Sequence, residues 1–174
     1  TVRQKLETNT WFGGGILLEN NMVFASANSS SSNSVNKAGV GGSMARFAIQ
    51  NNHLYTVTSY KLNILNIADP ENPVYKNETN LGWGIETIYP FKDRLFIGST
   101  TGMLIYSVAN PTSPVKLGSF EHAQVCDPVI ADDRYAYVTL RSGTTCNGFT
   151  NQLDVVDIEN LVQPKLVKSY NMTN

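Results

Sequence analysis

The segment LYTVTSYKLNILNIADPENP, residues 54–73, indicates the fold, because its pattern returns 41 positions later as LFIGSTTGMLIYSVANPTSP, residues 95–114. A third copy begins at Ala136, and in its second half the offset grows from 41 to 50 positions. The difference predicts a loop of about nine extra residues between Arg141 and Gln152, in a segment with the composition of a loop. A repeat of this period is typical of solenoids, propellers and arrays.

Each period reads as four short strands separated by turns. The strands are rich in β-branched and aromatic residues, and Gly, Pro, Asn and Asp punctuate them. No window carries apolar residues at the spacing of an amphipathic helix over enough length. Four antiparallel strands in about 40 residues is the size of one β-propeller blade. The sequence therefore predicts an all-β fold, a partial β-propeller of about three and a half four-stranded antiparallel blades.

We expect one β-propeller region over residues 1–174. An incomplete blade with a Ser-rich loop covers 11–43, and complete blades cover 44–80, 85–120 and 126–170. Propeller rings typically hold about 4 to 8 blades, and an open arc leaves sheet edges ready to pair. We therefore expect the chain to be a fragment of a longer propeller. The alternative is that a second copy closes the ring.

Composition argues against several classes of function. The chain has 13 basic and 14 acidic residues and a net charge of −1, so it lacks the basic surface that binds nucleic acid or anionic membranes. No segment approaches the roughly 20 apolar residues of a membrane span. The sequence contains no GxSxG elbow, HExxH motif or phosphate loop, and we expect no cofactor.

The strand and loop in the second half of each unit resemble the LVIVD repeat. The resemblance is carried by LNILNIADPENPV from Leu62, MLIYSVANPTSPV from Met103 and LDVVDIENLVQPKLV from Leu153. Proteins of this family are β-propellers, found largely in bacteria and often exported or lipid-anchored. GGSMARFAI and CDPVI…AYVTLRSG also look like secreted Bacteroidetes members. The resemblance implies a bacterial protein of the periplasm or cell surface, and it implies no activity.

Alternate loops of an antiparallel meander lie on the same side, so the loops sort into two faces. On one face the turns are short and repeat faithfully, as Asn51-Asn52 and Lys92-Asp93 illustrate. The other face, here called the loop face, carries divergent segments that include 28–43, 82–84 and 141–151. Divergent insertions on one face of a repeat protein usually mark its binding face. We therefore expect a ligand or partner on the loop face.

Five residues on the loop face are candidates for ligand binding. Glu86 and Asp127 lie 41 positions apart near the start of a first strand, and with His122 they could hold a cation or a polar ligand. Alternatively, the two carboxylates accept N–H groups of the next blade. Trp11 and Trp83 occupy matched positions and either form a stacking platform for sugar or peptide or wedge between blades as core. Ala45 holds the position of Glu86 and Asp127 in the preceding blade and interrupts the row of acids, which weakens a metal site. We assign no metal site and no catalytic residue.

Cys126 and Cys146 are also expected on the loop face, in the third complete blade. A disulfide between them would stabilise the fold by about 3 kcal/mol in the chain-entropy account. It would also imply an exported protein. The alternative is two unpaired thiols.

These observations favour a non-enzymatic, exported binding or scaffold module whose partner is a protein, peptide or glycan. One alternative is a propeller hydrolase or lyase with an acidic or metal site at the channel mouth. A second alternative is a structural spacer without a ligand. An enzyme predicts that Glu86 and Asp127 share a pocket, a binding module predicts exposed aromatic surface on the loop face, and a spacer predicts neither.

Overall fold

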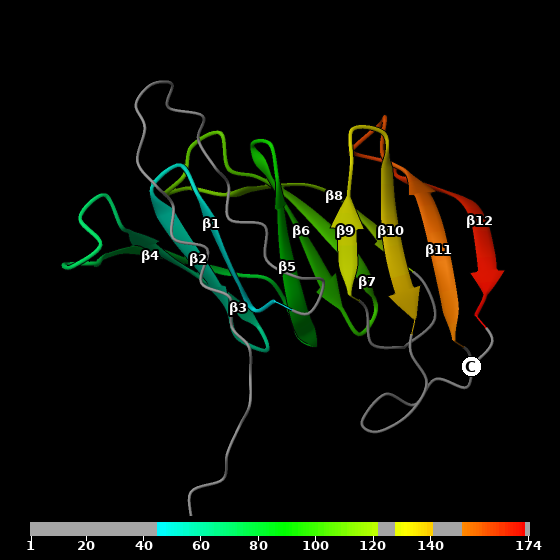
Figure 1. Ribbon diagram of the computed structural model, residues 1–174, viewed down its shortest axis with the longest axis horizontal. Coiled ribbons are helices and arrows are strands. Elements are labelled where there is room, and N and C mark those ends of the chain that lie inside the picture. Colours follow the sequence, from blue (N-terminus) through cyan, green and yellow to red (C-terminus); the bar gives the residue numbers. More distant parts are fainter. Residues whose placement is uncertain (1–44, 122–127, 141–150, 173–174) are drawn as a thin grey trace, which may run out of the picture. The chain divides into compact units, whose positions relative to one another are not determined.

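The computed structural model describes residues 45–121, 128–140 and 151–172, all of which belong to the compact unit Val35–Asn174. Every regular element among them is a β-strand (Figure 1), so the predicted all-β fold is confirmed. The described part of the chain holds no helix of the length and apolar character that a membrane crossing needs. The predicted incomplete blade at 11–43 lies outside the described residues.

The strands form three antiparallel sheets of four strands each. The first sheet contains β1 (Phe47–Gln50), β2 (His53–Val57), β3 (Lys61–Asn66) and β4 (Val74–Asn80). The second contains β5 (Ile85–Phe91), β6 (Arg94–Ser99), β7 (Gly102–Ser107) and β8 (Val115–Glu121). The third contains β9 (Val129–Ala131), β10 (Tyr135–Leu140), β11 (Gln152–Asp157) and β12 (Lys165–Asn171).

Each sheet is a meander, in which strands adjacent in the chain are adjacent in the sheet, as in a propeller blade. The first strand of each sheet contacts the first strand of the next sheet, β1 against β5 and β5 against β9 (Figure 1). The three described sheets do not close into a ring. They therefore represent part of a propeller, as the sequence predicts.

The repeat extends to details of the backbone. Every sheet has a β-bulge between its third and fourth strands, immediately after Ile64, Ile105 and Val155. These three residues are related by the same offsets of 41 and 50 positions that define the repeat. A bulge bends its strand and increases the local twist. The three sheets therefore share a curvature that lets them stack in the same way.

The loop between the third and fourth strands is also built alike in all three sheets. The side-chain oxygens of Asp69, Asn110 and Asn160 accept the N–H two residues further on, at 3.1, 3.3 and 3.1 Å. Their carbonyl groups accept the N–H three residues further on, at 3.2, 3.1 and 3.2 Å. Asp and Asn both supply the acceptor for this turn, so exchanging them preserves the loop.

The core consists of two layers, each formed between successive sheets. We call the side of a sheet that faces the preceding sheet its leading face, and the opposite side its trailing face. Because side chains alternate along a strand, neighbouring residues of β6 serve different layers. Leu95 and Ile97 on its leading face pack with Tyr55 and the first sheet, whereas Phe96 on its trailing face packs with the third. The second sheet is therefore buried on both faces.

Polar contacts fix how the first two sheets meet. The buried Tyr55 hydroxyl donates to the carbonyl oxygen of Pro111 at 3.1 Å. Burial raises the pKa of Tyr55 to about 12, so this hydroxyl remains a donor at physiological pH. Asn77 Nδ2 donates to the carbonyl oxygen of Thr112 at 3.0 Å. The loop between β7 and β8 is thus held against the trailing face of the first sheet.

Candidate functional site

The described part of the loop face contains the loops between β2 and β3 and between β6 and β7, and the segment that joins β4 to β5. Of the predicted site residues, Trp83 and Glu86 fall within it. The others, Trp11, His122, Cys126, Asp127 and Cys146, lie outside the described residues. The acid pair and the disulfide therefore stay predictions, and the site is built here from Trp83 and its neighbours.

Trp83 is held away from the core. Its side chain is 82% exposed, so it does not serve as the core wedge that the sequence left open as an alternative. It lies between Gly82 and Gly84, which have φ values of 91° and 78°. Only glycine adopts such angles without strain, and the two residues present the indole on a turn.

Trp83 has an aromatic partner that the sequence did not identify. The ring centroids of Tyr60 and Trp83 are 5.4 Å apart with an interplanar angle of 35°. This separation is in the range of favourable aromatic pairs. Tyr60 is 40% exposed, so the two rings form a continuous aromatic surface open to solvent. We call Tyr60 and Trp83 the aromatic pair.

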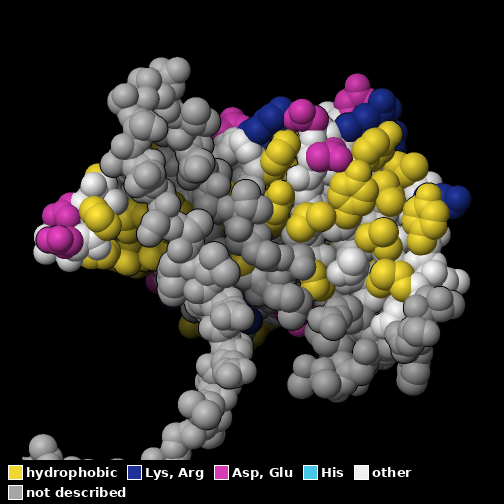
Figure 2. Space-filling view, viewed as in Figure 1, with side chains coloured by type: hydrophobic (Ala, Val, Ile, Leu, Met, Phe, Trp, Pro, Cys, Tyr) yellow, Lys and Arg dark blue, Asp and Glu magenta, His cyan; other side chains and the backbone are white. Residues whose placement is uncertain are grey.

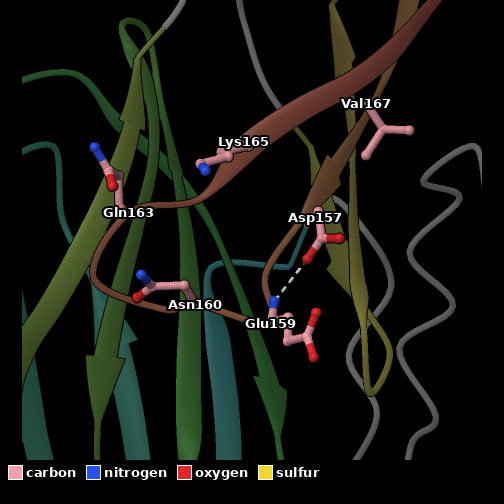
Figure 3. A pocket seen from close by; sticks show the side chains of 6 residues that line it. All are labelled: Asp157, Glu159, Asn160, Gln163, Lys165 and Val167. Atoms are coloured by element: carbon pink, nitrogen blue, oxygen red, sulfur yellow. Dashed lines mark hydrogen bonds between the residues drawn. The ribbon is translucent and has the colours of Figure 1, made fainter.

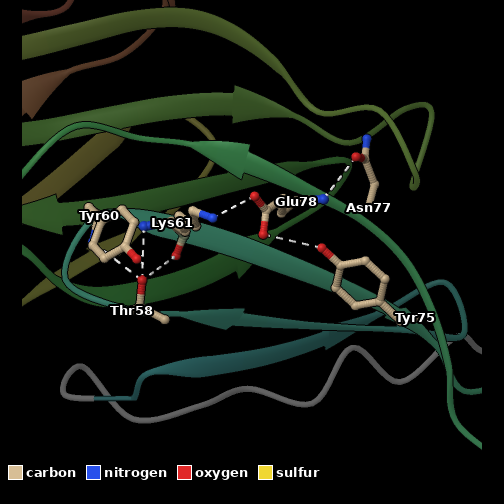
Figure 4. Close-up of polar contacts among 6 residues, drawn as sticks. All are labelled: Thr58, Tyr60, Lys61, Tyr75, Asn77 and Glu78. Atoms are coloured by element: carbon tan, nitrogen blue, oxygen red, sulfur yellow. Dashed lines mark hydrogen bonds and ion pairs between the residues drawn. The ribbon is translucent and has the colours of Figure 1, made fainter.

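Backbone hydrogen bonds fix the aromatic pair from both sides. The N–H of Leu81 donates to the carbonyl oxygen of Tyr60 at 2.8 Å, and the N–H of Ile85 donates to that of Ser59 at 3.0 Å. Thr58 Oγ1 accepts the N–H groups of Tyr60 and Lys61 and closes the loop between β2 and β3 (Figure 4). The two loops are therefore joined at the backbone.

A charged cluster lies beside Tyr60, one member of the aromatic pair (Figure 4). Lys61 Nζ is 2.5 Å from Glu78 Oε1, and it is 5.6 Å from the centre of the Tyr60 ring. Tyr75 donates its hydroxyl proton to the second oxygen of Glu78 at 3.4 Å. The hydrogen bond from Lys61 lowers the pKa of Glu78, and the same bond raises the pKa of Lys61. Both groups stay charged at neutral pH and offer a donor and an acceptor next to the rings.

Glu86 occupies an irregular position in its strand. Ile85 pairs with Ser99 and Thr87 pairs with Gly98, so Glu86 is the extra residue of a β-bulge in β5. Bulges often redirect a side chain next to a functional site. The guanidinium of Arg46 donates to the carbonyl oxygen of Ile85 at 3.3 Å, immediately beside this bulge. The structure thus places Glu86 at the start of β5, half-buried, as a candidate polar contact.

Clusters of metal-ligating side chains and surface hollows are the other features of the described residues that could carry chemistry. Among the described residues, no group of three His, Cys, Asp or Glu side chains is arranged to hold a metal ion. A hollow of about 390 Å³ lies on the third sheet, lined by Asp157, Glu159, Asn160, Gln163, Lys165 and Val167 (Figure 3). It adjoins the loop between β11 and β12, at the strand ends opposite the loop face. It is therefore separate from the aromatic pair.

Comparison with known proteins identifies the repeat. Residues 127–172 match the LVIVD repeat, and this range covers the whole third sheet from β9 to β12. The match confirms the resemblance seen in LDVVDIENLVQPKLV, its third copy in the sequence. No curated protein matches the chain.

Proposed function

We propose that this chain, a β-propeller module that carries an LVIVD repeat, is a non-enzymatic, exported binding module whose ligand meets the loop face. The ligand is a protein, peptide or glycan that contacts the aromatic pair Tyr60 and Trp83. Lys61 and Glu78 supply polar contacts beside the rings, and Glu86 supplies a further one from the bulge of β5. Trp11, His122 and Asp127 remain candidates for the same face.

The exposed aromatic pair is the observation that carries this proposal. Large apolar side chains in solvent gain nothing for folding, whereas Trp and Tyr are enriched among the residues that dominate binding energies. The pair is also preorganised, because the backbone bonds to Tyr60 and Ser59 hold both loops. A ligand therefore loses little binding free energy to the ordering of these side chains. A spacer without a ligand has no need of such a surface.

Replacement of Trp83 tests the proposal. We expect Trp83→Ala to weaken ligand binding by about 2 kcal/mol or more, roughly thirtyfold, because the indole supplies most of the exposed aromatic surface. The measurement is binding of the labelled chain to arrays of defined oligosaccharides and of peptides. Tyr170→Ala is the matched control, since Tyr170 is 47% exposed on β12 of a different sheet and belongs neither to the pair nor to the charged cluster. A ligand that Trp83→Ala binds as tightly as the parent would contradict the proposal.

Export rests on the family resemblance and on the two cysteines. In an oxidising compartment we expect Cys126 and Cys146 to form one disulfide. Alkylation of the denatured, unreduced chain, followed by measurement of its mass, should then add no alkyl group. Reduction before alkylation should add one group per cysteine. Two alkyl groups without reduction, in protein purified from its native compartment, would count against export.

A further inference from the structure

Gln50 is a buried polar residue that the aromatic pair does not use. It lies at the end of β1, on the same side of the strand as Ala48, which packs against the second sheet. Gln50 is only 5% exposed, and within the described part of the chain its buried Oε1 atom accepts no hydrogen bond. A buried acceptor without a donor costs free energy. The contact between the first two sheets therefore contains a polar group that opposes it.

The cross-strand neighbour of Gln50 does not supply the missing donor. His53 pairs with Gln50 across the turn between β1 and β2. Its Nδ1 atom is 2.7 Å from the carbonyl oxygen of Asn51. A carbonyl oxygen only accepts, so neutral His53 carries its ring proton on Nδ1, and its other ring nitrogen is an acceptor. The donor for Gln50 must therefore come from another residue on the trailing face of the first sheet.

The third sheet shows which donor this position can use. Asp132 and Tyr137 are the counterparts of Gln50 and Tyr55, two repeats further along the chain. Asp132 is exposed beside the turn after β9, where charged side chains gather on the surface (Figure 2). The Tyr137 hydroxyl donates to Asp132 Oδ2 at 3.0 Å, so this hydrogen bond lies within one sheet. Gln50 offers an equivalent oxygen to Tyr55, on a side chain that is one methylene longer.

Tyr55 nevertheless uses an acceptor in the neighbouring sheet. Its hydroxyl donates to the carbonyl oxygen of Pro111 at 3.1 Å. The second sheet has Phe91 and Phe96 at the positions of Gln50 and Tyr55, and both phenylalanines pack in the layer between the second and third sheets. An apolar pair is thus compatible with the stacking of two sheets at this place. Stacking alone does not explain why the first sheet has a polar pair there.

We propose that the Tyr55 hydroxyl is a two-position switch, which donates to Pro111 when the first two sheets are docked and to Gln50 when they separate. Docking exchanges a hydrogen bond within the first sheet for one between the sheets, and it leaves Gln50 without a donor. The hydroxyl of Tyr55 therefore contributes little net free energy to docking. The interface between the first two sheets is poised to open with little net loss of side-chain hydrogen bonds.

Opening of this interface would also release the aromatic pair. The N–H of Ile85 donates to the carbonyl oxygen of Ser59 at 3.0 Å, and the N–H of Ile88 donates to that of Ala45 at 2.9 Å. Both bonds cross from the second sheet to the chain of the first sheet, and the bond to Ser59 holds the two loops of the pair together. The switch thus regulates how rigidly the aromatic pair is held. This inference does not rest on the ligand of the pair.

Hydrogen exchange of the Ile88 amide tests the switch, because this N–H is bonded across the interface and becomes free to exchange when the sheets separate. We expect Gln50→Leu to slow its exchange about tenfold or more, because the substitution removes the unpaired acceptor from the docked state and the second acceptor from the open state. In a Tyr55→Phe background the same substitution should slow exchange several-fold less, because no hydroxyl then changes acceptors. Amides at the centre of β7, bonded within the second sheet, are the internal reference.

Tyr137→Phe is the matched control, because it removes the equivalent hydroxyl from the third sheet. It should leave exchange of the Ile88 amide unchanged. Gln50→Met is a second apolar variant, and circular dichroism verifies that each variant is folded. Equal slowing by Gln50→Leu in the two backgrounds, or no slowing in either, would overturn the proposal. A crystal structure in which an ordered water donates to Gln50 Oε1 between docked sheets would do so as well.

Discussion

Phe96→Ala is expected to lower the free energy of unfolding by about 3–5 kcal/mol. Phe96 is fully buried, and its ring fills the layer between the second and third sheets together with Met103 and Val138. Removing the ring loses the favourable free energy of its burial. It also leaves a cavity between two sheets, each of which is held rigid by its own hydrogen bonds. Those sheets cannot easily move together to fill the space, which places the cost at the upper end for such changes.

The repeat supplies the matched control for this prediction. Tyr137→Ala removes an aromatic ring from the equivalent position of the third sheet, where the ring is half-buried. Its cost should be well under half of that for Phe96→Ala when both are measured by urea denaturation at the same protein concentration. Because repeat proteins can unfold in stages, fluorescence and circular dichroism should be followed together. Equal losses for the two variants would contradict the assignment of the core layers.

Gly118→Ala is expected to cost about 1–3 kcal/mol or more and to loosen the third sheet from the second. A Cβ at Gly118 would lie 2.1 Å from the carbonyl oxygen of Leu161, which belongs to the loop between β11 and β12. This obstacle is backbone, and the loop that carries it is held by its own turn bonds at Asn160. The added methyl group therefore forces the two sheets apart.

Asn77 is the control for Gly118, because it holds the equivalent position in the first sheet. There the neighbouring loop leaves room for a side chain, and Asn77 donates to Thr112 across the interface. Asn77→Ala should lose that hydrogen bond, about 1 kcal/mol, together with a local, exposed one in which Asn77 Oδ1 accepts the N–H of Glu78 at 2.8 Å. Hydrogen exchange should show faster exchange in β10 and β11 for Gly118→Ala and no comparable change for Asn77→Ala. Unchanged exchange in the third sheet would contradict the close approach.

Part of the candidate site was predictable from the sequence. Spacing alone placed Trp83 in a divergent loop and Glu86 near the start of a first strand, and the structure has both there. Tyr60, Lys61 and Glu78 were not predicted, because their relation to Trp83 depends on bonds between two loops that lie far apart in the chain. The presence of Tyr60 in the loop between β2 and β3 was the only indication in the sequence. No local sequence rule predicts that this tyrosine contacts Trp83.

The period, the four strands of each unit and the turns between them can be derived from the amino-acid sequence alone. These features depend on local preferences, such as the positive φ values that Asn51 and Asn52 adopt in the tight turn between β1 and β2. The neighbour that each face of a strand meets depends instead on how the sheets stack. Alternation along a strand distinguishes two faces, but it does not say which one is leading. Stacking of whole sheets assigned Leu95 to one layer and Phe96 to the next, buried Tyr55, and left Tyr137 half-buried and Phe47 exposed.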